Sequence, residues 1–147
     1  MFLSQSPILS FKAKKNDLPQ KLEYTEVEQQ CNEVLKKLDS LERNIRVQKQ
    51  NLRDYYSSQD RYDYRELLKE RRRVAGQLRR IAKNAGVDEY ELEFCVRMKR
   101  EYNYYAPKIV RAKSKPELNQ VLDLINSSSL YVKTKELLAQ LIGKKKF

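Results

Sequence analysis

The segment Tyr24–Tyr56 carries a heptad repeat of apolar residues, and this repeat limits the possible folds more than any other feature of the sequence. Positions three and four residues apart alternate for more than four heptads. The repeating positions are Tyr24, Val27, Cys31, Val34, Leu38, Leu41, Ile45, Gln48, Leu52 and Tyr55. Such a repeat draws one apolar seam along a long helix, and the seam must pack against another helix. Thr25 and Glu28 form a capping box that predicts where this helix begins.

A second helix is predicted over Tyr62–Ala85, after a short turn at Tyr56–Asp60. Its apolar face, which only Arg71 interrupts, is in heptad phase and consists of Tyr64, Leu67, Val74, Leu78, Ile81 and Ala85. A turn of this length reverses the chain, so we expect an antiparallel helical hairpin with facing seams. Gln48, the single polar member of the first seam, is expected to set the register. The competing arrangement is a coiled coil with another chain. The first helix is predicted to be the longer one, so its N-terminal heptads are left to pack on something else.

The second helix also carries a row of cations on the face opposite its seam. This basic row consists of Arg65, Lys69, Arg72, Arg73, Arg79, Arg80 and Lys83. Residues three and four apart on a helix are neighbours, so the row is continuous and roughly 27 Å long. Gly76 lies near its middle, where a missing side chain allows either a close anionic backbone or close packing of a helix. A row of one charge sign favours an anionic partner.

The overall charge points the same way. Among 147 residues, 31 are Lys or Arg and 20 are Asp or Glu, which gives a net charge of +11. An excess of this size favours nucleic acid or an anionic surface, and the alternative is a merely soluble basic protein. No window is apolar enough to cross a membrane. The first residues, Met1–Phe11, fit neither a signal peptide nor a mitochondrial presequence, so a cytoplasmic location is expected.

A third helix is predicted over Asp88–Tyr105, after a join at which Gly86 ends the second helix. The join resembles a helix-turn-helix in Ile81, Ala82, Ala85, Gly86, Val87, Leu92 and Cys95. The resemblance implies that the third helix reads DNA. That helix, however, opens with four carboxylates that would repel the phosphates beside a groove, at Asp88, Glu89, Glu91 and Glu93. We therefore interpret the turn as structural.

Cations and tyrosines mix at the end of the third helix and in the connector predicted after Pro107. From Arg97 to Lys115 there are seven cations and one acid, with three tyrosines among them. Cations follow a phosphate backbone while tyrosines stack on bases. The alternative is that the tyrosines belong to the core and the lysines to a solvated connector. The residues predicted to extend the nucleic-acid site are Arg100, Tyr104, Lys108, Arg111 and Lys113.

Two shorter helices are predicted at the C-terminal end. Ser114 and Glu117 form a capping box for the first, Asn126–Ser129 breaks it, and the last helix covers Val132–Ile142. Helix, serine-rich link and helix together resemble a SAP-type DNA-binding module, but that family has a glycine in the link. We therefore expect a plain helical hairpin here.

The predicted fold is all-α, a long antiparallel coiled-coil-like hairpin with two or three shorter C-terminal helices packed beside it. The predicted domains are an extended arm at 1–22, the hairpin with the third helix at 23–113, and a C-terminal helix pair at 114–147. In the arm, five apolar residues either dock onto a groove or stay mobile, namely Phe2, Leu3, Ile8, Leu9 and Phe11.

Catalysis and metal binding are not indicated. The sequence has no histidine and no nucleotide-binding or hydrolase motif. Cys31 and Cys95 lie on apolar helix faces, which is typical of buried thiols rather than of zinc ligands. We expect no cofactor and no membrane partner. The sequence predicts a non-enzymatic nucleic-acid-binding subunit of a nucleoprotein assembly, with RNA or DNA left open. The alternative is a coiled-coil interaction or oligomerisation module whose basic face meets an acidic protein.

Overall fold

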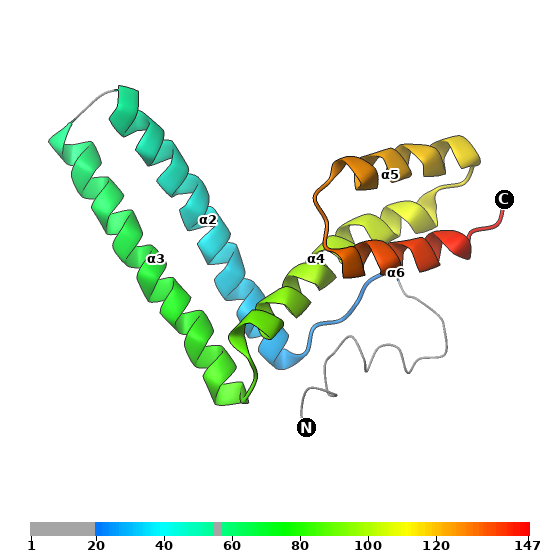
Figure 1. Cartoon of the computed structure of the whole chain (residues 1–147), viewed down its shortest axis with the longest axis horizontal. Coiled ribbons are helices and arrows are strands. Elements are labelled where there is room, and N and C mark those ends of the chain that lie inside the picture. Colours follow the sequence, from blue (N-terminus) through cyan, green and yellow to red (C-terminus); the bar gives the residue numbers. More distant parts are fainter. Residues whose placement is uncertain (1–19, 55–56) are drawn as a thin grey trace. The chain divides into compact units, whose positions relative to one another are not determined.

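The computed structural model describes residues 20–54 and 57–147, and the regular structure in these residues is helical (Figure 1). The helices in chain order are α2 (Glu26–Asp54), α3 (Ser58–Ala85), α4 (Glu89–Arg111), α5 (Lys115–Ser127) and α6 (Val132–Gly143). The predicted all-α class, with a long antiparallel hairpin and shorter C-terminal helices, is confirmed.

The described residues form two compact units that meet within α4. The hairpin unit is Glu26–Glu93, and the C-terminal unit consists of residues 20–25 together with Phe94–Phe147. The domain boundaries predicted from the sequence, after residues 22 and 113, remain a prediction.

In the hairpin unit, α2 and α3 pack against each other in antiparallel directions (Figure 1). Val74 and Leu78 of the predicted α3 seam are buried, as is Ile45 of the α2 seam. Polar contacts also join the helices. Gln48 Nε2 donates to the Asp60 backbone oxygen at 3.1 Å, and Arg71 Nη1 contacts Glu42 Oε1 at 3.1 Å. Because the contact of Gln48 joins one point of each helix, it supports the register role expected from the sequence.

The start of α3 corrects the predicted boundary. The helix begins at Ser58 and not at Tyr62, because Ser57 adopts an extended conformation and its Oγ accepts the Asp60 amide at 3.0 Å. The serines that suggested a turn therefore cap and open the helix. As a result α2 has 29 residues and α3 has 28, so the first helix is the longer one, as predicted, by one residue only.

The burial pattern of α2 also differs from a single seam. Glu28 and Leu35, which lie off the predicted seam, are buried, whereas Leu38 and Leu41 on it are half-buried. The N-terminal half of α2 thus has a second buried face. A heptad pattern cannot show this, because Glu28 is charged and Leu35 stands one position from the repeat.

The join between α3 and α4 has the predicted caps. Gly86 has φ 69°, in the left-handed region, and its amide donates to the Lys83 oxygen at 3.1 Å. Asp88 Oδ2 accepts the Glu91 amide at 3.0 Å and so caps the start of α4. Glycine suits position 86 because it has no Cβ that would strain the left-handed conformation.

In the C-terminal unit, α4 continues through Pro107 to Arg111, so the prediction that this proline ends the third helix is wrong. Proline inside a helix removes a hydrogen bond and costs roughly 3 kcal/mol. Ala106, Ile109 and Ala112 on either side of it are buried, the first two completely. Burial of this face offsets the cost, because each fully buried isoleucine-sized side chain contributes about 1.5–3 kcal/mol.

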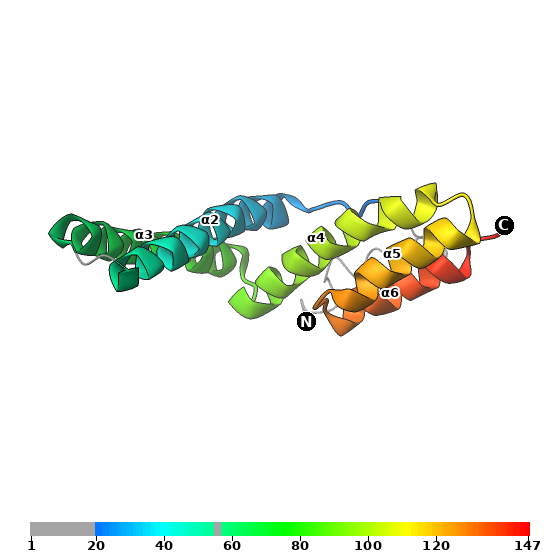
Figure 2. The ribbon, with the colours of Figure 1, turned by 90° about the horizontal axis from the view of Figure 1, so that it is seen from above.

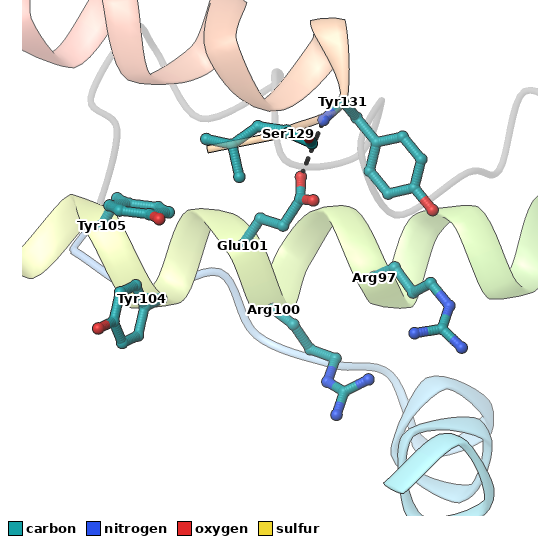
Figure 3. A pocket seen from close by; sticks show the side chains of 8 residues that line it. Arg97, Arg100, Glu101, Tyr104, Tyr105, Ser129 and Tyr131 are labelled. Carbon is teal, nitrogen blue, oxygen red and sulfur yellow. Dashed lines mark hydrogen bonds between the residues drawn. The ribbon is translucent and has the colours of Figure 1, made fainter. Parts of the chain in front are cut away.

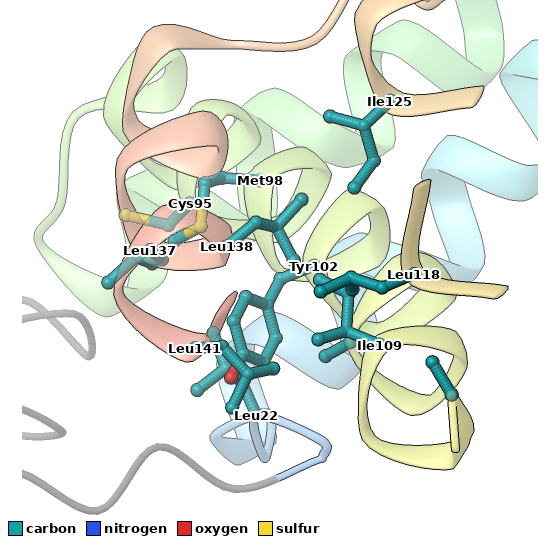
Figure 4. Close-up of a cluster of buried hydrophobic side chains, with 12 residues drawn as sticks. Leu22, Cys95, Met98, Tyr102, Ile109, Leu118, Ile125, Leu137, Leu138 and Leu141 are labelled. Atoms are coloured by element: carbon teal, nitrogen blue, oxygen red, sulfur yellow. The ribbon is translucent and has the colours of Figure 1, made fainter. Parts of the chain in front are cut away.

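The core of this unit lies between α4, α5 and α6, which lie side by side (Figures 1 and 2). Figure 4 shows Tyr102 of α4 surrounded by apolar side chains, including Leu22, Leu138 and Leu141. Tyr102 is fully buried, and burial raises its pKa from 10.0 to about 12. It is therefore a core residue and not a surface for base stacking.

The segment before α2 is tied to α4 by its backbone. The Leu22 amide donates to Asn103 Oδ1 at 2.6 Å, and Asn103 Nδ2 donates to the Leu22 oxygen at 3.0 Å. Lys99 Nζ, on a buried side chain, donates to the Glu23 oxygen at 2.8 Å. These bonds fix residues 22–23, while the apolar residues of the predicted arm lie outside the described residues.

Both cysteines are buried thiols, as predicted, and do not form a disulfide. In the part of the chain that the structure describes, no helix has the length and apolar character needed to cross a membrane.

Candidate nucleic-acid interface

The basic row of α3 lies on the face that α2 leaves uncovered. Its residues are all exposed, namely Arg65, Lys69, Arg72, Arg73, Arg79, Arg80 and Lys83. The buried residues of α3, Val74 and Leu78 among them, lie on the opposite side of the helix. The charge is concentrated in the second half, because residues 71–85 contain six cations and no acid. The structure thus presents the predicted row as one exposed cationic face.

Three cations of the row have carboxylate partners. The pairs are Lys69–Glu66 at 3.1 Å, Arg73–Glu70 at 2.5 Å and Arg79–Glu89 at 3.7 Å. The Arg73 guanidinium donates to both oxygens of Glu70 and holds the pKa of that carboxyl below its ordinary value. Exposed pairs of this kind contribute about 0–1 kcal/mol each, so a polyanion can compete for these cations.

The other four cations have no such partner. Arg65, Arg72, Arg80 and Lys83 make no ion pair or hydrogen bond with the residues that the structure describes. They are spread along the row, so unpaired positive charge remains from its first residue to its last.

Gly76 lies among the arginines of the row. Arg72 and Arg73 precede it by four and three residues, and Arg79 and Arg80 follow it at the same spacings. A Cβ at this position would come within 4 Å of one group only, the Arg80 Nη1 atom at 3.7 Å. Close packing of another helix, one of the two explanations for this glycine, therefore finds no support.

A second basic face lies on α4, in the other unit. Because α4 continues through Pro107, the predicted site residues Arg100, Tyr104, Lys108 and Arg111 follow one another at spacings of four, four and three residues on a single helix. Tyr104 is 61% exposed, and Lys108 Nζ lies 4.7 Å from the centre of its ring. Lys113 follows the helix, and its amide donates to Glu117 Oε2 at 3.1 Å. The site residues that were expected to be divided between a helix and a connector thus lie mostly on one helix, α4.

A pocket that the sequence did not predict borders this face (Figure 3). It has a volume of about 660 Å³ and lies between α4 and residues 129–131, which link α5 to α6. Glu101 holds the link in place, because its Oε1 accepts the Tyr131 amide at 3.2 Å and the Thr134 hydroxyl at 2.6 Å. The only signal in the sequence was that Glu101 is the single acid of a basic segment.

No known family model matches this chain, and neither a curated protein nor a solved structure is significantly similar to it. Among the described residues, no three Cys, Asp or Glu side chains are grouped in a way that could hold a metal ion.

Proposed function

We propose that this protein binds nucleic acid without catalysing a reaction, as an accessory or structural subunit of a cytoplasmic nucleoprotein assembly. The observation that carries the proposal is the basic row of α3. Its seven cations are exposed on one helix face, and four of them have no carboxylate partner among the described residues.

A phosphate backbone is the ligand that suits such a row. Nucleic acid carries closely and regularly spaced phosphates, and each phosphate neutralised by a cation releases bound counterions. The four unpaired cations alone would supply about four contacts, which corresponds to a slope of about −3.6 in log affinity against log salt on duplex DNA. Contacts to phosphates position a protein but do not read sequence, so we expect little sequence preference.

The rival function is an interaction module. One form of it needs a free heptad seam, but the seams of α2 and α3 pack on each other within one chain. In the other form the basic row meets an acidic protein. That form uses the same cations as nucleic-acid binding, so an experiment must distinguish the two.

The test is fluorescence anisotropy of the full chain with labelled duplex DNA, single-stranded DNA and RNA, and with polyglutamate as a polyanion without phosphates. We expect binding to at least one nucleic acid with a steep salt dependence, and weaker binding to polyglutamate. Tighter binding to polyglutamate would support the interaction module. Absence of salt-dependent nucleic-acid binding at low ionic strength would refute the proposal.

A further inference from the structure

The pocket between α4 and the α5–α6 link has rigid aromatic walls. The Tyr105 hydroxyl and the Ser128 hydroxyl are 2.7 Å apart and hydrogen bonded, which fixes one wall. The backbone amide of Tyr131 donates a hydrogen bond to Glu101, and the Tyr131 ring packs edge to face on Phe94 with ring centres 4.9 Å apart. Since these contacts lie within one compact unit, the walls are preorganised.

Cations and an exposed aromatic ring stand at the edge of this pocket. Arg97 and Arg100 lie three residues apart on α4, and both point away from the link in Figure 3. Tyr104 follows by one helical turn, and its ring lies edge to face against Tyr105 with centres 4.9 Å apart. A large exposed tyrosine beside arginines is the combination that holds a base by stacking and its phosphate by charge.

The acid in the pocket, Glu101, points towards the link in Figure 3, whereas Arg97 and Arg100 point away from it. Glu101 directs its Oε1 to the Tyr131 amide and to the Thr134 hydroxyl, so this oxygen is engaged in holding the link. Its role is therefore structural. The volume of about 660 Å³ lies within the roughly 300–1,000 Å³ that is usual for pockets holding small organic ligands.

We propose that the α4 edge of this pocket, formed by Arg97, Arg100 and Tyr104, binds one nucleotide of a single-stranded nucleic acid, with the base against Tyr104 and the phosphate on the two arginines. The inference rests on the proposed function and adds strandedness to it. In a duplex the faces of the bases are already stacked on one another, so an exposed tyrosine can take up only a base that is unpaired or flipped out.

The experiment compares two single-stranded probes of equal length, an oligothymidylate and an oligomer whose sugars carry no bases. Both carry the same phosphates, so only the first can stack. We expect the full chain to bind oligothymidylate more tightly. Tyr104→Ala should weaken that binding about tenfold, as expected for the loss of one stacked base, and should leave the abasic oligomer unaffected. Tyr104→Phe should retain the affinity.

Tyr90→Ala is the matched control, because Tyr90 is 79% exposed and lies outside the pocket. The inference is overturned if Tyr104→Ala binds oligothymidylate like the wild type, or if it loses affinity for both probes equally.

A second readout separates this inference from the proposed function. Binding of thymidine 5′-monophosphate is measured by the chemical-shift changes that it causes in NMR spectra of the full chain. We expect these changes to include Tyr104 in the wild type and to be lost in Tyr104→Ala. Alanine at Arg72 and Arg80 of the basic row should leave these shifts unchanged while weakening binding of both oligomers. Unchanged binding of both oligomers by the Arg72 and Arg80 variant would count against the proposed function, whereas absence of the shifts in the wild-type chain would count against the pocket.

Discussion

Gly76→Ala should make the protein more stable. Gly76 lies in the interior of α3, and glycine there costs roughly 0.5–1 kcal/mol relative to alanine because it loses more backbone freedom on folding. The structure shows no steric cost of the added methyl group that would oppose this gain. The new methyl group would contact only Arg80 Nη1, at the ordinary distance of 3.7 Å, and Gly86 is the only described glycine with a positive φ.

A gain of that size corresponds to a rise of about 2–8 °C in the melting temperature of a domain of 60–100 residues. Circular dichroism during heating and in urea measures it. Gly86→Ala is the control, because φ 69° at that position strains any residue with a Cβ, and this variant should be less stable. If Gly76→Ala were instead destabilised, something would pack against this position, and the account of an uncovered basic row would be wrong.

Gly76→Glu tests whether the same position takes part in nucleic-acid binding. Glutamate is a good helix former, so stability should not fall below that of the wild type. Its carboxylate would stand among four arginines, pair with some of them and repel phosphates. We expect weaker nucleic-acid binding with a flatter salt dependence, so stability and affinity move in opposite directions. Unchanged affinity would show that no nucleic-acid backbone approaches this part of α3.

Other substitutions test the seam, the join and the core. Val74→Asp should unfold the hairpin unit, because Val74 is 1% exposed and an unpaired buried carboxylate costs several kcal/mol; a milder loss is expected for Leu38→Asp, whose site is half-buried, and urea denaturation compares the two. Replacing Glu89 and Glu91 by Gln should leave nucleic-acid affinity unchanged or raise it slightly, since repulsion falls and Arg79 is released; a marked loss in anisotropy titrations would revive the helix-turn-helix interpretation. Tyr102 has a folded pKa of about 12, above its ordinary value of 10.0, so its contribution to stability is complete below pH 10 and is lost as the pH rises towards 12. Melting curves of Tyr102→Phe should therefore show a smaller loss of stability over that range than those of the wild type.

The hairpin was predictable because its signals are local and periodic. The cap at Gly86, the exposure of the basic row and the burial of Val74 and Leu78 follow from residue spacing alone, and the structure reproduces them. The end of the α3 seam was wrong, because Ala85 is exposed and Ala82 is buried in its place. A periodic pattern determines which residues share a helix face, and that was sufficient to predict the row.

The failures occurred where packing at long range overrides a local signal. Pro107 usually ends a helix, but the buried residues around it continue the helix to Arg111. Lys99 is one of the seven cations counted from Arg97 to Lys115, yet its side chain is buried and its Nζ donates to the Glu23 oxygen. The pocket depends on a link folded onto α4 through Glu101, which no spacing in the sequence indicates.

The most direct test of the central claim is the salt dependence of nucleic-acid binding after charge removal from two matched places. Arg72→Ala with Arg80→Ala removes two unpaired cations of the basic row. Arg43→Ala with Arg46→Ala removes two exposed arginines from α2 and gives the same net charge.

We predict that the row variant binds more weakly to all sequences, with a slope of log affinity against log salt that is shallower by about 1.8 on duplex DNA or about 1.4 on single strands. The α2 variant should keep a slope close to that of the wild type. Equal slopes for the two variants would mean that binding follows net charge and not the basic row, and would contradict the account.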